Sequence, residues 1–288
     1  MIKKGIILAG GTGSRMSPIT KAVNKQLLPL YDKPLLYYPL SILMLAKIRD
    51  VLIIVNKGQI EQFKKVLPNG NNLGIKITYA EQEKPRGIPD AFIVGEKFIG
   101  SNSVALILGD NFFFGQNLTK KLQECTKLSK GAKIFLHPVK NTSLYGIATA
   151  NKNNKIINIV EKPKKIKSNL AVTGLYFFDN KVIKFSKSLA LSKRKEIEIV
   201  DLLNKYKKEK QLSAEIIGRG GAWLDTGSII DFNNASNFVA TIENRQGFKI
   251  GCIEEIAFQN KWINKDHIKK AVNFYGNCEY SQYISKFI

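Results

Sequence analysis

The sequence is poor in the residues that build disulfide frameworks and common metal centres. It has three cysteines, Cys125, Cys252 and Cys278, far apart and without a C-x-x-C pair, and only two histidines, His137 and His267. This excludes a disulfide scaffold, a thiolate metal site and a histidine-rich metal site. Scattered thiols are typical of a reducing compartment, so we expect a cytoplasmic protein.

Long apolar runs are also lacking. No stretch approaches the roughly 20 consecutive apolar residues that a membrane span needs. The apolar run after the first lysines is too short for the core of a signal peptide, and no cleavage site of small residues follows it. With 288 residues, 44% of them hydrophobic, the chain can bury a full core. We therefore expect a protein that is neither membrane-spanning nor secreted.

Acidic residues are outnumbered, with 23 Asp and Glu against 45 Lys and Arg and a net charge of +22. Such an excess suggests nucleic-acid binding. The lysines, however, are spread along the whole chain, and aromatic residues are not interleaved with basic clusters such as 162–167, as a base-stacking platform would require. We expect no nucleic-acid partner, while attraction of small phosphate anions stays open.

Short apolar runs alternate with amphipathic segments in the first half of the chain. The pattern predicts strands at 6–9, 51–55, 75–79, 104–108 and 132–136, and helices at 35–47 (opened by Pro34), 59–66, 91–97 and 118–127. Such alternation predicts β-α-β units. We expect the α/β class, with a Rossmann-like, doubly wound, mixed and mostly parallel sheet. Ligands bind such sheets at the carboxyl ends of their strands.

The rhythm changes after about residue 138. The sequence predicts a hairpin of 147–150 with 156–160, strands at 172–178 and 214–217, and a helix at 199–208. The last sixty residues are mainly helical in pattern, with Ser228 capping a helix over 229–243 and another near 268–275. We expect one α/β unit with a helical C-terminal appendage.

A glycine-rich turn follows the first predicted strand. Gly10, Gly11 and Gly13 come directly after the apolar run, and Arg15 and Lys25 follow them. Glycine permits positive φ, so successive N–H groups can point at one anion. Neither the dinucleotide pattern G-x-G-x-x-G nor the P-loop fits these residues. The pattern indicates a loop that holds a polyphosphate between cations, and a tight turn without a ligand is the alternative.

Two aspartates follow apolar runs that lie far apart in the chain. Asp110 ends VALILGD, and Asp225 stands in AWLDTGS. Mg²⁺ prefers oxygen ligands and usually takes only one or two protein carboxylates. The spacing does not show that the two meet, and a turn aspartate and a helix N-cap are the alternatives. No Ser-His-Asp or Cys-His set is evident. The cations, glycines and carboxylates are compatible with phosphoryl or nucleotidyl transfer, which depends on neutralising and aligning charge.

Motifs along nearly the whole chain carry a family resemblance. The run LAGGTGSRMSPITKAVNKQLLPLYDKPLLYYPLSILMLAKIRDVLII resembles the N-terminal signature of the sugar-nucleotidyltransferases. The strings EQEKPRGIPDAF, LGDNFFFG, LYGIA, IVEKPKK, AVTGLYFFD, EIEIVDLL, GRGGAWLDTGS and IGCIEEIAF follow in that family's order. The similarity is strongest to the members that use dTTP and glucose 1-phosphate.

This resemblance implies a function. It implies Mg²⁺-dependent transfer from dTTP to α-D-glucose 1-phosphate, giving dTDP-glucose and pyrophosphate in dTDP-rhamnose or deoxysugar biosynthesis, by a homotetramer. A uridylyltransferase or another sugar-1-phosphate nucleotidyltransferase of the same fold is the alternative. A single domain over 1–288 would have a nucleotide-binding half at 1–137, a sugar-binding half at 138–227 and a helical C-terminal segment at 228–288.

The resemblance also implies residue roles. Arg15 steadies the leaving phosphates, Lys25 adds charge near the transferring group, and Lys162 holds the sugar phosphate. Asp110 and Asp225 hold the metal. The implied nucleotide-binding positions are Gly10, Gly11, Gly13, Gln26, Gln82, Gly87, Asp110 and Asn111, of which Gln82 and Gly87 read the thymine edge. The implied sugar-binding positions are Tyr145, Gly146, Glu161, Lys162 and Val172. The presence of both metal ligands and all three catalytic cations argues against an inactive regulatory relative.

Several positions depart from the family pattern. The family usually has E-G-L-A-Q-A-F where this chain has Arg86 to Phe92. Pro89 is compatible with a first helical turn, whereas Asp90 replaces a glutamine and is expected to disturb the nucleotide-facing edge. Gln259 stands where the family has an arginine, in a segment that forms a regulatory nucleotide site in relatives. Its loss argues against feedback by a dTDP-sugar and leaves catalysis unaffected.

Overall fold

The computed structural model describes residues 1–192 and 194–288. Its strands are β1 Lys4–Leu8, β2 Pro29–Leu30, β3 Lys33–Pro34, β4 Asp50–Asn56, β5 Lys76–Gln82, β6 Val104–Leu108, β7 Asn111–Gly115, β8 Ala132–Pro138, β9 Gly146–Ala150, β10 Ile156–Glu161, β11 Leu170–Phe178, β12 Leu212–Ile216 and β13 Gly221–Asp225. Its α-helices are α1 Tyr37–Leu45, α2 Ile60–Val66, α3 Asp90–Val94, α4 Glu96–Ile99, α5 Leu118–Thr126, α6 Lys181–Lys187, α7 Ile199–Lys208, α8 Ile229–Gln246, α9 Ile253–Gln259, α10 Lys265–Tyr275 and α11 Glu279–Ile284.

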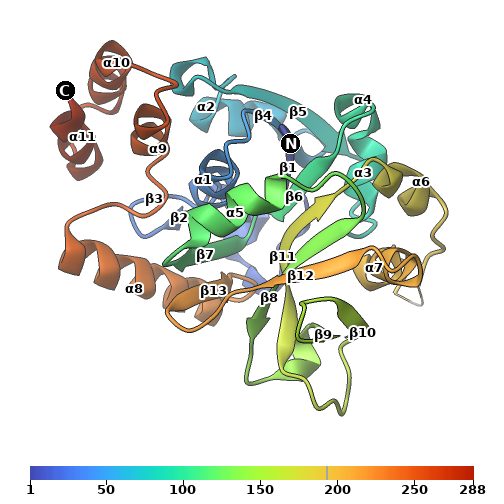
Figure 1. The fold of residues 1–288 in the computed structure, drawn as a ribbon. Coiled ribbons are helices and arrows are strands. Elements are labelled where there is room, and N and C mark those ends of the chain that lie inside the picture. Colours follow the sequence, from blue (N-terminus) through green and yellow to red (C-terminus); the bar gives the residue numbers. More distant parts are fainter. Residues whose placement is uncertain (193) are drawn as a thin grey trace.

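A nine-stranded mixed sheet runs through the molecule, with helices on both of its faces (Figure 1). The strand order is β10-β9-β11-β6-β1-β4-β5, and β8 pairs with both β11 and β12. Along β1, Ile7 packs into an apolar cluster with residues of α1, α5 and α9, whereas Ile6 packs into another with residues of α3, α6 and α7. Successive side chains of a strand point to opposite faces, so the sheet is buried on both sides, and the expected α/β class is confirmed.

Four parallel strands, β5, β4, β1 and β6, form the N-terminal part of the sheet. In the register, Ile6 lies beside Leu52 of β4 and Leu106 of β6. The carboxyl ends of these strands therefore share one edge, at which Gly10, Asn56 and Asp110 all follow or end a strand. This edge is where parallel sheets bind ligands.

The second half joins the sheet through the antiparallel pairing of β11 with β6, whereas β12 pairs with β8 in parallel. β11 pairs with β6, β8 and β9, and the predicted hairpin of β9 with β10 is confirmed. The predicted strand at 132–136 is also confirmed as β8. It pairs with β11 and β12 rather than with the parallel strands of the first half.

A two-stranded ribbon of β7 with β13 has no counterpart in the sequence prediction. It joins the segment after β6 to the segment before α8 and places Asp225 opposite Asn111. Its strands are short and aromatic-rich, and Phe112 packs in a small cluster with Tyr38 and Val239 rather than against the main sheet. The pairing of β7 with β13 depends on this tertiary packing, which the local sequence pattern does not predict.

Two predicted helix boundaries are wrong. The helix expected to open at Pro34 begins at Tyr37, because Pro34 pairs with Pro29 in the β2–β3 hairpin. The helix expected over 91–97 is divided at Gly95 into α3 and α4.

In the C-terminal segment, Ser228 caps α8 as predicted, and its hydroxyl accepts from the Asp231 N–H at 3.1 Å. Within the described residues, no helix combines the length and hydropathy needed to cross a membrane.

Candidate active site

The centre of the candidate site is the pair of aspartates that the sequence left unconnected. Asp110 follows β6, and Asp225 ends β13 directly across the ribbon from Asn111. Thr226 fixes this junction, because its N–H and its hydroxyl both donate to the Asp110 carbonyl, at 3.1 and 2.8 Å. The two acids therefore lie side by side. Asp225 is not a helix cap, a role that belongs to Ser228.

Lys25 is the cation in contact with this pair. Its Nζ lies 2.5 Å from Asp110 Oδ2 and 3.4 Å from the Thr226 carbonyl oxygen. Burial alone would raise the pKa of Asp110, but Lys25 and the Asn111 amide outweigh it and hold that pKa below its usual value. Burial, followed by the charge of Asp110, raises the pKa of Asp225 to about 6. The pair thus concentrates more negative charge than Lys25 balances.

The donor chemistry fits Mg²⁺. Across residues 1–192 and 194–288, no group of three or more His, Cys, Asp and Glu side chains is placed to hold a metal ion. A metal here would have Asp110 and Asp225 as its protein ligands and would complete its shell with phosphate oxygens and water, which is the usual Mg²⁺ arrangement. A divalent cation would also relieve the repulsion that raises the Asp225 pKa.

Arg15 approaches the same centre from the glycine loop, residues 10–13. A Cβ atom placed on Gly227 would lie 2.9 Å from Asp225 Oδ1 and 3.0 Å from a guanidinium nitrogen of Arg15. The two side chains therefore meet over Gly227, which leaves room for them only because it has no side chain. Arg15, Lys25, Asp110 and Asp225 are thus brought together as expected.

The glycine loop differs in one respect from the expectation. Gly11 and Gly13 have positive φ, 122° and 59°. The Gly11 N–H, however, donates to Asn56 Oδ1 at 2.9 Å, and the Asn56 amide donates back to the Gly11 carbonyl at 2.8 Å. This amide is therefore engaged within the protein and is not one of those that can point at an anion. Asn56 sets the shape of the loop instead, at the end of the neighbouring strand β4.

Gln82 lies under the glycine loop. It is 4% exposed, its amide donates to Asn56 Oδ1 at 3.3 Å, and a Cβ on Gly10 would come within 1.8 Å of its Nε2. Gly10 thus has to be a glycine because Gln82 occupies the adjacent space. Gly87 is also required by packing, since it has φ 102° and a Cβ there would lie 2.1 Å from the Ile197 carbonyl oxygen.

Gln26 and Asn111 are buried positions that hold the centre in place. Gln26 packs against Gly109, where an added Cβ would lie 2.9 Å from its Cγ. Asn111 Oδ1 accepts from the Gly174 N–H at 2.9 Å and from the Trp223 indole at 2.6 Å, while its amide donates to Asp110. Asn111 therefore connects the aspartate pair to β11 in the second half of the chain.

The expected sugar-binding residues converge on β9, β10 and β11. A Cβ on Gly146 would lie 3.2 Å from Glu161 Oε2 and 3.8 Å from Val172 Cγ2. The Lys162 N–H donates to the Tyr145 carbonyl at 3.0 Å, and the Tyr145 ring packs edge-on against Trp223 with centroids 5.1 Å apart. Trp223 thus touches Asn111 with its indole N–H and Tyr145 with its ring. The residues expected to bind the sugar and those expected to bind the metal, called below the sugar side and the metal-binding side, meet at this residue.

A cavity of about 260 Å³ opens beside this junction and is lined by Tyr145, Trp223 and Asp225 among others. On the outer side of the sugar cluster, Lys162 Nζ lies 4.0 Å from Glu161 Oε1. Arg194 also pairs with Glu161, at 3.2 Å, and with Glu198, at 2.6 Å. The two cations of this cluster, Lys162 and Arg194, are far more exposed than Lys25.

Comparison with known proteins decides the family. The model of the family described as Nucleotidyl transferase matches residues 4–242. The chain belongs to the nucleotidyl transferase family. Among curated nucleotidyl transferases, the glucose-1-phosphate thymidylyltransferase of Neisseria meningitidis is 46% identical over 285 residues, 99% of either chain, and that of Mycobacterium tuberculosis is 42% identical over the same span.

Solved structures of nucleotidyl transferases have the same fold. One from Bacillus anthracis, in complex with sucrose and described as a glucose-1-phosphate thymidylyltransferase, is 40% identical, with a TM-score of 0.75 over 82% of this chain and 94% of its own. A UDP-glucose pyrophosphorylase with bound UDP-glucose is 27% identical, with a TM-score of 0.74 over 84% of this chain and 99% of its own.

Four residues of this nucleotidyl transferase site were missed by sequence reasoning. Asn56, Trp223 and Arg194 are recognisable only from tertiary contacts, although Asn56 does end a predicted strand. Arg86 was noted merely as a departure from the family pattern. Arg86 precedes α3 and pairs with Asp90 at 2.8 Å; Asp90 is 2% exposed, so the charge of this replacement is balanced within the protein.

Proposed function

We propose that this chain transfers the thymidylyl group of dTTP to α-D-glucose 1-phosphate, giving dTDP-glucose and pyrophosphate. An oxygen of the sugar phosphate attacks the α-phosphorus of dTTP in line. The bond between the α-phosphorus and the bridging oxygen breaks, and pyrophosphate leaves. The names of the relatives at 42–46% identity over nearly the full chain support these substrates.

The observation that carries the proposal is the convergence of Arg15, Lys25, Asp110 and Asp225 at the carboxyl edge of the parallel strands, with the sugar cluster adjoining through Trp223. Charge on the transferring and leaving phosphates grows during the reaction, and preorganised cations lower the barrier to it. Arg15 steadies the leaving phosphates, Lys25 acts near the transferring group, and Lys162 holds the sugar phosphate. Asp110 and Asp225 would hold Mg²⁺, which supplies Lewis-acid stabilisation to the phosphate oxygens when bound.

Substrate orientation is assigned to the flanking pockets. Gln82 has a side-chain amide that can pair a donor and an acceptor with a pyrimidine edge, and Gly87 borders it in the sequence motif. Glu161 accepts hydroxyl hydrogens of the hexose, with Tyr145, Gly146 and Val172 around the ring. The protein acts in the cytoplasm as a homotetramer, and its product enters dTDP-rhamnose or deoxysugar biosynthesis.

Pyrophosphate release across a matrix of dTTP and UTP with several sugar 1-phosphates tests the proposal. We expect the highest kcat/KM with dTTP and glucose 1-phosphate, and partial acceptance of UTP, since one methyl group discriminates by only about 1–3 kcal/mol. Turnover should vanish in EDTA and return with Mg²⁺. A strong preference for UTP would replace the proposal with a uridylyltransferase, for which the similarity to UDP-glucose pyrophosphorylase is the supporting observation.

A further inference from the structure

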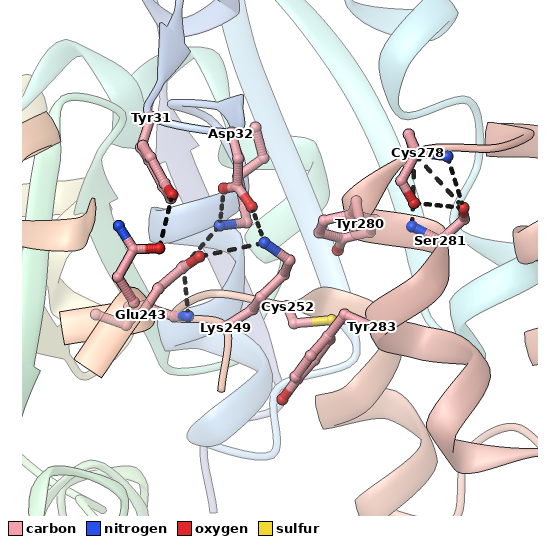
Figure 2. Close-up of polar contacts among 12 residues, drawn as sticks. Tyr31, Asp32, Glu243, Lys249, Cys252, Cys278, Tyr280, Ser281 and Tyr283 are labelled. Carbon is pink, nitrogen blue, oxygen red and sulfur yellow. Dashed lines mark hydrogen bonds and ion pairs between the residues drawn. The ribbon is translucent and has the colours of Figure 1, made fainter. Parts of the chain in front are cut away.

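Four charged side chains form a buried network outside the candidate site. Lys33 Nζ lies 3.0 Å from Glu243 Oε1, Lys249 Nζ lies 3.3 Å from Glu243 Oε2, and both lysines pair with Asp32. The Lys33 side chain is 2% exposed and that of Glu243 is 4% exposed. Figure 2 shows Lys249 facing both carboxylates. Two cations and two anions balance each other, so we treat these four residues as one unit, the ion network.

Stability alone is a weak explanation for such a network. Removing charges from water is costly, and a buried ion pair is often no more stabilising than apolar side chains of the same size. What paired, hydrogen-bonded charges do define is the relative position of the elements that carry them. The relevant question is therefore which parts of the chain the ion network joins.

One of those parts leads directly to Lys25. Asp32 and Lys33 lie in the β2–β3 hairpin, which follows the short turn that carries Lys25 and Gln26. Backbone hydrogen bonds tie the base of the hairpin to this turn, since Leu36 N–H donates to the Gln26 carbonyl at 2.9 Å. Displacement of the hairpin would therefore displace the turn that presents Lys25 to Asp110.

The other part leads to Asp225. Helix α8 begins four residues after Asp225 and carries Glu243 in its last turn, roughly 20 Å from its start. The hairpin contacts α8 at two further points, because the Tyr31 N–H donates to Ser236 Oγ at 3.0 Å and the Tyr31 hydroxyl to Asn244 Oδ1 at 3.3 Å. The two segments that leave the site at Lys25 and at Asp225 thus meet again at the ion network.

We propose that Asp32, Lys33, Glu243 and Lys249 are positioning residues that fix Lys25 relative to Asp225 by joining the hairpin after Lys25 to the helix after Asp225. This inference rests on the proposed function only in that Lys25 acts in nucleotidyl transfer. The two segments are in contact at the site and again at the ion network. The distance between Lys25 and Asp225 is therefore fixed at both ends of these segments.

The test removes one cation and one anion together, so that the remaining pair stays balanced. In Lys33→Met/Glu243→Gln, the new amide oxygen can still accept the Ile250 N–H, which donates to Glu243 at 2.8 Å in the parent. We expect kcat to fall about tenfold with both KM values within twofold of wild type, because a small misplacement of a reacting group costs rate rather than binding. The matched control Lys121→Met/Glu215→Gln removes a partly buried ion pair remote from the hairpin and should leave kcat unchanged.

A cycle with Lys25→Ala separates positioning from general destabilisation. If the network acts through Lys25, its removal should cost less than twofold in kcat once Lys25 is absent. A kcat within twofold of wild type in the folded double variant, or an equal loss in both backgrounds, would overturn the inference. If Lys33→Met/Glu243→Gln does not fold, the more exposed pair Asp32→Asn/Lys249→Met decides by the same criteria.

All rates are taken with the best substrate pair of the matrix described above. A different preferred nucleotide or sugar would therefore overturn the proposed function while leaving this comparison of variants intact. Circular dichroism and thermal melting of each variant establish that the measured enzyme is folded.

Discussion

The metal-binding side and the sugar side of the site are built in different ways. On the metal-binding side, Lys25, Gln82 and Asn111 are nearly buried, and each is held by hydrogen bonds inside the protein. On the sugar side, Lys162 and Arg194 are 46% and 45% exposed, and they pair with Glu161 at the protein surface. Buried, fixed charges are strong because water does not screen them, whereas exposed ion pairs are weak and adaptable. The first side is preorganised for the reacting phosphates, and the second can rearrange around a hexose.

The largest effect is expected for Asp225→Asn. It removes a proposed metal ligand from the metal-binding side and keeps the shape of the side chain. We therefore expect kcat to fall roughly a hundredfold to a thousandfold, as when a key electrostatic group is lost. The fold should persist, because Asp225 is held by backbone pairing with Asn111. Pyrophosphate release and thermal melting check both points. The control Asp231→Asn changes a neighbouring acid that serves the α8 cap. Turnover like that of wild type in Asp225→Asn would remove this residue from the mechanism.

Lys25→Met should cost about a hundredfold in kcat. It leaves the charge of Asp110 without its 2.5 Å partner in a largely desolvated position. Steady-state kinetics with saturating substrates measure this loss. Lys57→Met removes an exposed ion pair of similar length as a control and should have no effect. A loss confined to KM would show that the buried side does not differ from the sugar side in the way described here.

Gly10→Ala tests how closely the metal-binding side is packed. The added Cβ has no room beside Gln82, so we expect a loss of about 1–3 kcal/mol in unfolding free energy, as in overpacked cores, together with a raised KM for dTTP. Urea unfolding and kinetics measure the two effects. Gly218→Ala is the matched control, since nothing lies within 4 Å of a Cβ at that position. An unchanged KM for dTTP would separate Gln82 from nucleotide binding.

Arg194→Gln should give the smallest effect. It removes an exposed pairing with Glu161, so we expect the KM for glucose 1-phosphate to change by only about threefold, in line with the energy of exposed ion pairs. Lys181→Gln, which removes an equally exposed pair with Glu209, is the control. A tenfold or greater fall in kcat for Arg194→Gln would mean that the sugar side contains a preorganised charge after all.

The difference between the two sides also explains how much could be predicted. The periodic spacing of apolar residues and the turn residues between them predicted β1, β4, β6, the β9–β10 hairpin and α7, because these elements follow local sequence patterns. The glycine loop and both aspartates stood out for the same reason. The β7–β13 ribbon, the role of Asn56 and the meeting of Asn111 with Trp223 depend on contacts between distant segments. The role expected for Lys162 came from family resemblance, since its exposed position carries no local signal.

The β7–β13 ribbon also has a consequence for when the protein can acquire activity during its synthesis. Asp110 leaves the ribosome long before Asp225, with most of the second half of the chain between them. The parallel strands can already assemble at that stage, yet the metal pair is incomplete until β13 aligns with β7. A nascent or truncated chain that ends before residue 221 would therefore have a nearly finished nucleotide-facing edge and no means of turning substrate over. The proposed activity therefore depends on a late step, the pairing of β13 with β7, which brings Asp225 to Asp110.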